Sequence, residues 1–223
     1  MKYQAVLFDL DGTLLDTMPL IIQCFQKVLR HYTQEDWHRA QIHTLLGPGE
    51  SVIFSQIFGE QSQMVLNTYL ECYRNGHDRI AIQPAFYALF DALDAQGVHF
   101  GIVTNKEHDT TQITLEHVQL HNRFSYIITS KDVERPKPYP EGIQKALAYW
   151  QIPPEQAVFI GDMDNDVQAA RAAGVAIIQA GWFLPPDQRE QIQGDWPVAD
   201  TLEDLFRLLG LAEDDIATMP LKT

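Results

Sequence analysis

The chain has few basic residues, only two cysteines and no long apolar run. It carries 16 Lys and Arg residues against 30 Asp and Glu, which gives 223 residues a formal net charge of −14. Because no Lys/Arg cluster offsets this charge, we expect no nucleic acid among its partners. No stretch approaches the roughly 20 apolar residues of a membrane span, and the apolar stretch after Met1 is too short for a signal peptide. We therefore expect a cytoplasmic protein without a membrane partner. We also expect a monomer or a weak homodimer.

The two cysteines predict neither a metal site nor a redox motif. Cys24 and Cys72 are far apart in the sequence and match no metal-binding spacing. Disulfides are rare in intracellular proteins, so we expect two reduced thiols. The remaining composition, 45% hydrophobic and 21% charged, is ordinary for a globular protein.

The most informative segment is 5–13, where a short apolar run leads into two aspartates. The run 5–8 is typical of a buried strand. Asp9 and Asp11 lie two residues apart, so in an extended chain their side chains point the same way. Two like charges this close require a cation between them, or one of them must keep its proton. The pair therefore predicts a divalent metal, an acid–base role, or both.

Strands alternate with helices from about residue 83 onward. This alternation predicts a parallel sheet covered by helices on both faces, an α/β fold of the doubly wound class. The expected strands span 98–103, 126–129, 157–160 and 175–179, and the expected helices span 85–96, 108–118, 140–150, 166–173 and 201–209.

The segment between the first two strands differs, because its pattern is helical throughout. Helices are expected over 18–32, 34–46, 50–58 and 61–74, with no convincing strand between them. We predict an α/β core formed by 1–16 and 81–211, an inserted helical cap domain over 17–80, and a C-terminal tail over 212–223. Ligands of open α/β sheets bind at the carboxyl ends of the strands, so the cap would cover the site and could exclude water.

Polar side chains also follow the other strands. Thr104, Asn105 and Lys106 end the second strand, Lys137 lies between two prolines after the third, and the acidic segment 161–166 ends the fourth. Carboxylates without a nearby histidine or thiol suit magnesium rather than zinc. Hydroxyl, amide and ammonium groups suit phosphate oxygens. Together these side chains predict a phosphoryl-transfer site.

These four segments, in this order, resemble the four motifs of the haloacid dehalogenase superfamily. The helical insertion resembles the cap of its subgroup that contains phosphoglycolate phosphatases and pyrophosphatases. The resemblance implies a Rossmann-like core. It also implies a magnesium-dependent phosphatase that hydrolyses a small phosphate ester or pyrophosphate through an aspartyl phosphate.

The resemblance also implies catalytic roles. Asp9 matches the nucleophile, and Asp11 matches the general acid–base that protonates the leaving group and then activates water. Thr104 matches the hydroxyl that binds a phosphoryl oxygen. Lys137 matches the cation that neutralises the nucleophile and the phosphate, and Asp166 matches the acid that orients this lysine or a metal-bound water.

The binding residues follow from the same resemblance. Asp9, the backbone carbonyl of Asp11, and Asp162 match the magnesium ligands. Lys106 either contacts substrate or caps the sheet edge, and His77 either contacts substrate or packs within the cap. The substrate-binding candidates are Gly12, Asn105, Lys106, Gly47 and His77.

Two alternatives remain open on the sequence. A sugar-phosphate mutase of the β-phosphoglucomutase type is weakened because Gly161 stands before Asp162 where mutases typically carry Glu. A phosphorylatable receiver-like signalling module would also place acids, a threonine and a lysine at a sheet edge. Such modules lack a helical insertion after the first strand and have no need of Asp11.

Overall fold

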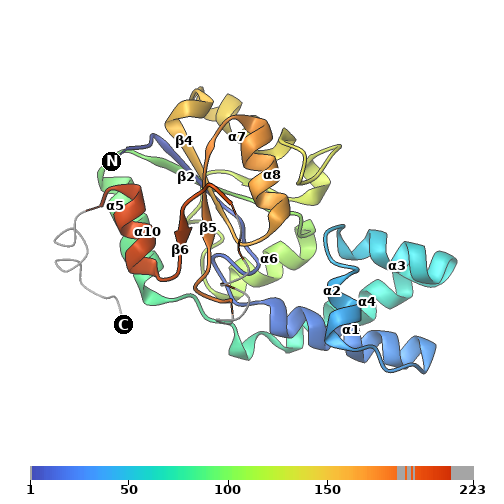
Figure 1. Cartoon of the computed structure of the whole chain (residues 1–223). Coiled ribbons are helices and arrows are strands. Elements are labelled where there is room, and N and C mark those ends of the chain that lie inside the picture. The colour runs from blue at the N-terminus through green and yellow to red at the C-terminus, as the bar shows by residue number, and fades with distance from the viewer. Residues whose placement is uncertain (1, 185–188, 190–191, 193, 212–223) are drawn as a thin grey trace.

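A six-stranded parallel sheet forms the centre of the molecule (Figure 1). The structure is a computed structural model, and it describes residues 2–184, 189, 192 and 194–211. The strand order is β3-β2-β1-β4-β5-β6, so the chain builds outward from β1 in one direction and then in the other. This is the predicted doubly wound α/β fold. The strands are β1 (Ala5–Phe8), β2 (His99–Val103), β3 (Ile127–Ile128), β4 (Ala157–Gly161), β5 (Ala176–Ala180) and β6 (Val198–Ala199).

The central strand β1 is buried on both faces, as its continuous apolar sequence predicts. Its side chains alternate between two apolar clusters. Val6 and Phe8 belong to the cluster on one face, and Ala5 and Leu7 belong to the cluster on the other. The backbone N–H of Asp9 continues the ladder by donating to Ile160 O at 2.8 Å. Asp9 is therefore fixed at the carboxyl end of the buried central strand.

Helices cover both faces of this sheet (Figure 1). Side chains of α7 and α8 belong to the same apolar cluster as Leu7, and side chains of α5, α6 and α10 belong to the cluster of Phe8. The two helical layers protect the parallel strands from water on both sides. These helices are α5 (Pro84–Ala95), α6 (His108–His117), α7 (Glu141–Trp150), α8 (Asp164–Ala173) and α10 (Leu202–Leu209).

A separate helical layer lies between β1 and α5 in the sequence and beside the sheet in space (Figure 1). Its core contains Phe25, Phe54 and Tyr69, whose ring centroids lie 5.0 to 5.5 Å apart. Close aromatic packing of this kind stabilises a small helical unit. We call this unit the helical layer; it consists of α1 (Met18–Thr33), α2 (Arg39–His43), α3 (Glu50–Phe58) and α4 (Ser62–Asn75).

Two elements differ from the sequence-based prediction, and a third lies where it is not tested. The expected helix over 34–46 is reduced to α2, because Gln34 adopts a left-handed conformation (φ 61°) that ends α1. Strand β6 was not predicted, since two residues are too short for a periodic pattern. The expected tail over 212–223 lies outside the described residues.

The expectation of two reduced thiols is wrong. Cys24 of α1 and Cys72 of α4 form a disulfide, and their Cα atoms lie 5.7 Å apart. The separation of 48 positions concealed the pair because α1 and α4 pack side by side only in the folded layer. None of the described helices has the length and apolarity of a membrane span.

Reduction of this disulfide is expected to lower the free energy of unfolding by about 2–4 kcal/mol, because the bond restricts a long loop of the unfolded chain. Urea unfolding with and without dithiothreitol measures the change. A double variant, Cys24→Ala with Cys72→Ala, is the control and should show no response to the reductant. Identical unfolding midpoints for the oxidised and reduced wild type would contradict the prediction.

Candidate functional site

The strand ends converge at one edge of the sheet, where a cavity of about 770 Å³ opens toward the helical layer. Asp9 follows β1, Thr104 follows β2 and Asp162 follows β4, so the parallel strands bring together residues that are distant in sequence. Lys137 lies in the loop between β3 and α7. The predicted candidates Asp9, Asp11, Gly47, Thr104, Asn105, Lys106 and Lys137 all line this cavity.

Three buried carboxylates lie close together, and two of them contact a single ammonium group. Ligand atoms of Asp9, Asp162 and Asp166 lie within 4.8 Å of one another. Lys137 Nζ lies 2.8 Å from Asp9 Oδ1 and 2.6 Å from Asp166 Oδ1. Burial raises the pKa of Asp9 to about 6, although Lys137 opposes the shift. Burial and the two other carboxylates also raise the pKa of Asp162.

The arrangement of these carboxylates fits a divalent cation. One lysine leaves the three acids with excess negative charge, and hard oxygen donors suit Mg²⁺. Both oxygens of Asp166 are occupied, one by Lys137 and the other by the Met163 N–H at 2.9 Å. Asp162 Oδ2 lies over Gly12 (φ 83°), where a Cβ would approach it to 2.4 Å. Gly12 therefore provides the room for the Asp162 carboxylate. Because both oxygens of Asp166 are occupied, Asp9 and Asp162 are the better ligands for a cation.

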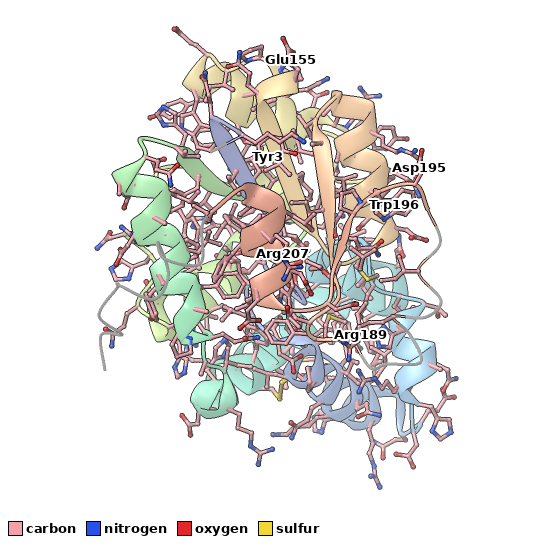
Figure 2. The ribbon with its side chains drawn as sticks, turned by 60° about the vertical axis from the view of Figure 1, so that its left-hand side comes forward. Tyr3, Glu155, Arg189, Asp195, Trp196 and Arg207 are labelled. Carbon is pink, nitrogen blue, oxygen red and sulfur yellow. A yellow bond between two sulfur atoms is a disulfide. The ribbon has the colours of Figure 1, made fainter. Side chains whose placement is uncertain are left out.

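Asp162 is anchored from two directions. Thr13 Oγ1 donates to Asp162 Oδ1 at 3.1 Å, and Gln179 Nε2 donates to the Asp162 backbone carbonyl at 3.0 Å. Gln179 Oε1 in turn accepts from Trp196 Nε1 at 2.7 Å, and Figure 2 labels Trp196 on the segment that leads to β6. The segment before β6 thus helps to hold Asp162 in place.

Asp11 has different partners from Asp9. Lys106 Nζ lies 3.1 Å from both carboxylate oxygens of Asp11, and Thr17 Oγ1 donates to Oδ1 at 2.5 Å. The ammonium of Lys106 also lies 4.5 Å from the centroid of the Tyr73 ring. Each aspartate of the pair therefore has its own lysine, Lys137 for Asp9 and Lys106 for Asp11.

Asn105 holds two loops at the cavity. Its Oδ1 accepts from the Lys137 N–H at 2.9 Å, and its Nδ2 donates to the Lys137 carbonyl at 2.8 Å. The same Nδ2 donates to Gly47 O at 3.0 Å, which links the sheet edge to the helical layer. The neighbouring Thr104 is buried, and its Oγ1 accepts from the Lys106 N–H at 3.2 Å. The amide of Asn105 is already used for positioning these loops.

Four predicted candidates are not among the described residues that line the cavity: Gly12, Asp162, Asp166 and His77. The first three lie in or beside the acidic cluster with Asp9, whereas His77 packs elsewhere. His77 is 2% exposed and is absent from the described residues that line the cavity. Its Nδ1 lies 2.6 Å from Tyr73 O, and its Nε2 lies 3.1 Å from Thr114 Oγ1. This environment favours the packing alternative for His77 over substrate contact.

Sequence reasoning missed three residues near the cavity. Thr17 binds Asp11, Glu50 lines the cavity from α3, and Glu107 accepts a hydrogen bond from the Ser51 N–H at 3.0 Å. The position of Thr17, just after the first motif, could have indicated its role. Glu50 and Glu107 gave no signal, because acids near helix starts are common.

Comparisons with known proteins match most of the chain. The profile of the haloacid dehalogenase-like hydrolase family matches residues 6–180. The pyrophosphatase PpaX of Bacillus mycoides (strain KBAB4) is 32% identical over 212 residues, covering 94% of this chain and 98% of the relative. The pyrophosphatase PpaX of Anoxybacillus flavithermus is 33% identical over 214 residues, covering 95% and 99%.

Two solved structures share the fold. A putative phosphoglycolate phosphatase from Lactobacillus plantarum has a TM-score of 0.77 at 25% identity, covering 93% of this chain and all of that one. CbbY from Rhodobacter sphaeroides, solved in complex with phosphate, has a TM-score of 0.79 at 21% identity and covers 96% and 99%. At this identity, the second likeness concerns the fold alone.

In the absence of metal, Asp9 is expected to make the protein less stable as the pH rises. Its pKa is about 6 in the folded state against an ordinary 3.8, so between these values the folded state binds more protons than the unfolded state. The stability of Asp9→Asn relative to wild type should therefore increase by about 2–3 kcal/mol between about pH 4 and pH 7. Urea unfolding in chelator at several pH values measures this difference.

The control is Asp164→Asn, which removes an exposed carboxylate nearby. Its stability should follow that of the wild type across the same pH range. If the Asp9→Asn and wild-type curves ran parallel, Asp9 would not carry the expected proton.

Proposed function

The chain belongs to the haloacid dehalogenase-like hydrolases, and we propose that it releases phosphate from a small phosphate ester or pyrophosphate through an aspartyl phosphate on Asp9. The observation that carries this proposal is the position of Asp9. It lies at the carboxyl end of the central strand, faces the cavity and pairs with Lys137 at 2.8 Å. A carboxylate held beside a fixed cation is placed to approach an anionic phosphoryl group.

The reaction has two steps. In the first, an Asp9 oxygen forms a bond to phosphorus, the bond from phosphorus to the leaving oxygen breaks, and Asp11 gives that oxygen its proton. In the second, Asp11 takes a proton from water, the water oxygen attacks phosphorus, and Asp9 leaves with inorganic phosphate released. One carboxyl group thus serves as nucleophile and the other carries the proton.

Lys137 supplies fixed positive charge in both steps. Burial alone would lower its pKa, but Asp166 and Asp9 outweigh burial and hold the pKa above its ordinary value. Lys137 therefore stays protonated, so that it reduces the repulsion between Asp9 and an incoming phosphate. Asp166 has both oxygens occupied and acts by positioning this lysine.

Magnesium fits beside the nucleophile. Asp9, Asp162 and the backbone carbonyl of Asp11 would hold it, and its charge would neutralise phosphoryl oxygens. Thr104 lines the cavity and its hydroxyl is available to a phosphoryl oxygen.

The helical layer is proposed to act as a cap carried by 17–80 over a core of 1–16 and 81–211. Two contacts support this role. Asn105 donates to Gly47 O, and Glu107 accepts from the N–H of Ser51 at the start of α3. Asp11 also bonds to Thr17, directly before α1, so the proton carrier sits at the connection between the two parts.

Asp9→Asn is expected to reduce turnover by at least about 10⁴-fold, because the neutral amide cannot form the acyl phosphate. At saturating Mg²⁺, binding of a phosphate ester should persist, since the amide is nearly isosteric with the carboxylate and leaves Lys137 in place. Phosphate release and calorimetric binding measure the two effects. Activity near that of the wild type would remove the nucleophile assignment.

Removal of magnesium by a chelator is expected to abolish phosphate release, and added Mg²⁺ should restore it. Asp162→Asn should raise the half-saturating Mg²⁺ concentration by about tenfold or more, because it removes a charged ligand. Asp164→Asn, an exposed aspartate two positions away, is the matched control and should keep the wild-type response. Equal magnesium curves for the two variants would count against a metal at Asp162.

A further inference from the structure

The wall that the helical layer contributes to the cavity is apolar except at one position. Glu50 has the only polar side chain among the described lining residues that come from the layer. A wall of this kind binds carbon chains and offers a substrate only one polar partner. The lining residues from this part of the chain are Met18, Ile21, Phe25, Leu46, Gly47, Pro48, Gly49, Glu50, Val52 and Ile53.

Glu50 is buried and incompletely bonded. It is the first residue of α3 and is 7% exposed, and its Oε2 has no hydrogen-bond partner among the described residues. Burial raises its pKa, and the positive charge of Lys106 opposes the shift. A buried carboxylate oxygen without a partner is costly for the protein alone. Because Glu50 lines the cavity, its carboxylate is the acceptor that the layer offers to a ligand there.

A side chain of the core holds the start of α3, where Glu50 lies. Gly49, at the N-cap of α3, has no side chain to cap the helix, and Glu107 of the core does so instead. Glu107 Oε1 accepts hydrogen bonds from the backbone N–H and the hydroxyl of Ser51. A Cβ at Gly49 would come within 2.5 Å of that oxygen, so the glycine permits the approach. The residue next to Glu50 is thus fixed to the core.

All three lysines that line the cavity already face carboxylates. Lys137 contacts Asp9 and Asp166, and Lys106 contacts Asp11. The third, Lys131, lies 3.4 Å from Glu107. Among the described lining residues, no lysine is therefore left without a carboxylate partner, although Lys131 is more than half exposed.

We propose that Glu50 selects the leaving group by accepting a hydrogen bond from a hydroxyl or ammonium and by repelling a second anionic group. The inference rests on the proposed phosphohydrolase function and narrows it. The favoured substrates are organic phosphate monoesters whose leaving group carries a hydrogen-bond donor, in preference to phosphoglycolate and pyrophosphate. Selection of this kind combines attraction to one leaving group with repulsion of another.

The test uses three substrates with one two-carbon skeleton. 2-Phosphoglycolate, 2-hydroxyethyl phosphate and phosphoethanolamine differ in a carboxylate, a hydroxyl and an ammonium, and pyrophosphate completes the set. With Mg²⁺ and the full chain, the kcat/KM of the hydroxyl and ammonium compounds should exceed that of phosphoglycolate and pyrophosphate by about tenfold or more. Glu50→Gln should reduce this ratio about tenfold, because it removes the repelling charge and keeps the shape.

Two further variants control for structure. Glu134→Gln removes the charge of an exposed glutamate that also lines the cavity, and it should change the ratio by less than about twofold because solvent screens that charge. Glu50→Asp keeps the charge and should retain the discrimination against phosphoglycolate. Circular dichroism confirms folding of each variant.

Two results would overturn the proposal. One is a wild-type preference for phosphoglycolate or pyrophosphate, and the other is a Glu50→Gln effect that is equal for all four substrates. Absence of phosphate release from every compound would instead count against the proposed function. Calorimetric binding of the same compounds to Asp9→Asn, with and without Glu50→Gln, still tests Glu50 in that case, because the order of affinities should depend on Glu50 alone.

Discussion

The ion pair of Lys137 with two buried aspartates is the interaction on which the rest of the site depends. Lys137 lies within 2.8 Å of both Asp9 and Asp166, and without it three carboxylates would share a buried space with no cation. Such uncompensated charge is strongly destabilising. Asn105 binds both the N–H and the carbonyl of Lys137, so the backbone of the loop that carries the lysine is held in place as well.

A second lysine divides the two neighbouring aspartates into different environments. Asp9 belongs to the cluster around Lys137, whereas Asp11 is held by Lys106 and Thr17. Two aspartates that lie only two positions apart in the sequence therefore have separate partners. In the proposed reaction, this division would distinguish the nucleophile from the proton carrier, since the two share one chemical group and differ in what surrounds it.

The sequence predicted the parts of the site that follow from local pattern. A short apolar run followed by Asp9 and Asp11 indicates a strand and its end, and parallel strands bring their ends together. Other features depend instead on how helices pack: the positions of Glu50 and His77 and the Cys24–Cys72 disulfide. Helical periodicity shows which face of a helix is buried, but it does not show which element that face packs against. Strand β6 was missed because two residues carry no period.

The hydrogen bond at the N-terminus of α3 couples the helical layer to the core. In many helices the N-cap side chain accepts a hydrogen bond from one of the first N–H groups. In α3 the N-cap residue is Gly49, and the Ser51 N–H donates instead to the carboxylate of Glu107 in the core. The first turn of α3 is therefore complete only while the layer rests on the core. If the helical layer moved away from the core, the Ser51 N–H would lose this acceptor and the helical turn that carries Glu50 would become less ordered. The order of this one turn therefore depends on whether the layer is in contact with the core.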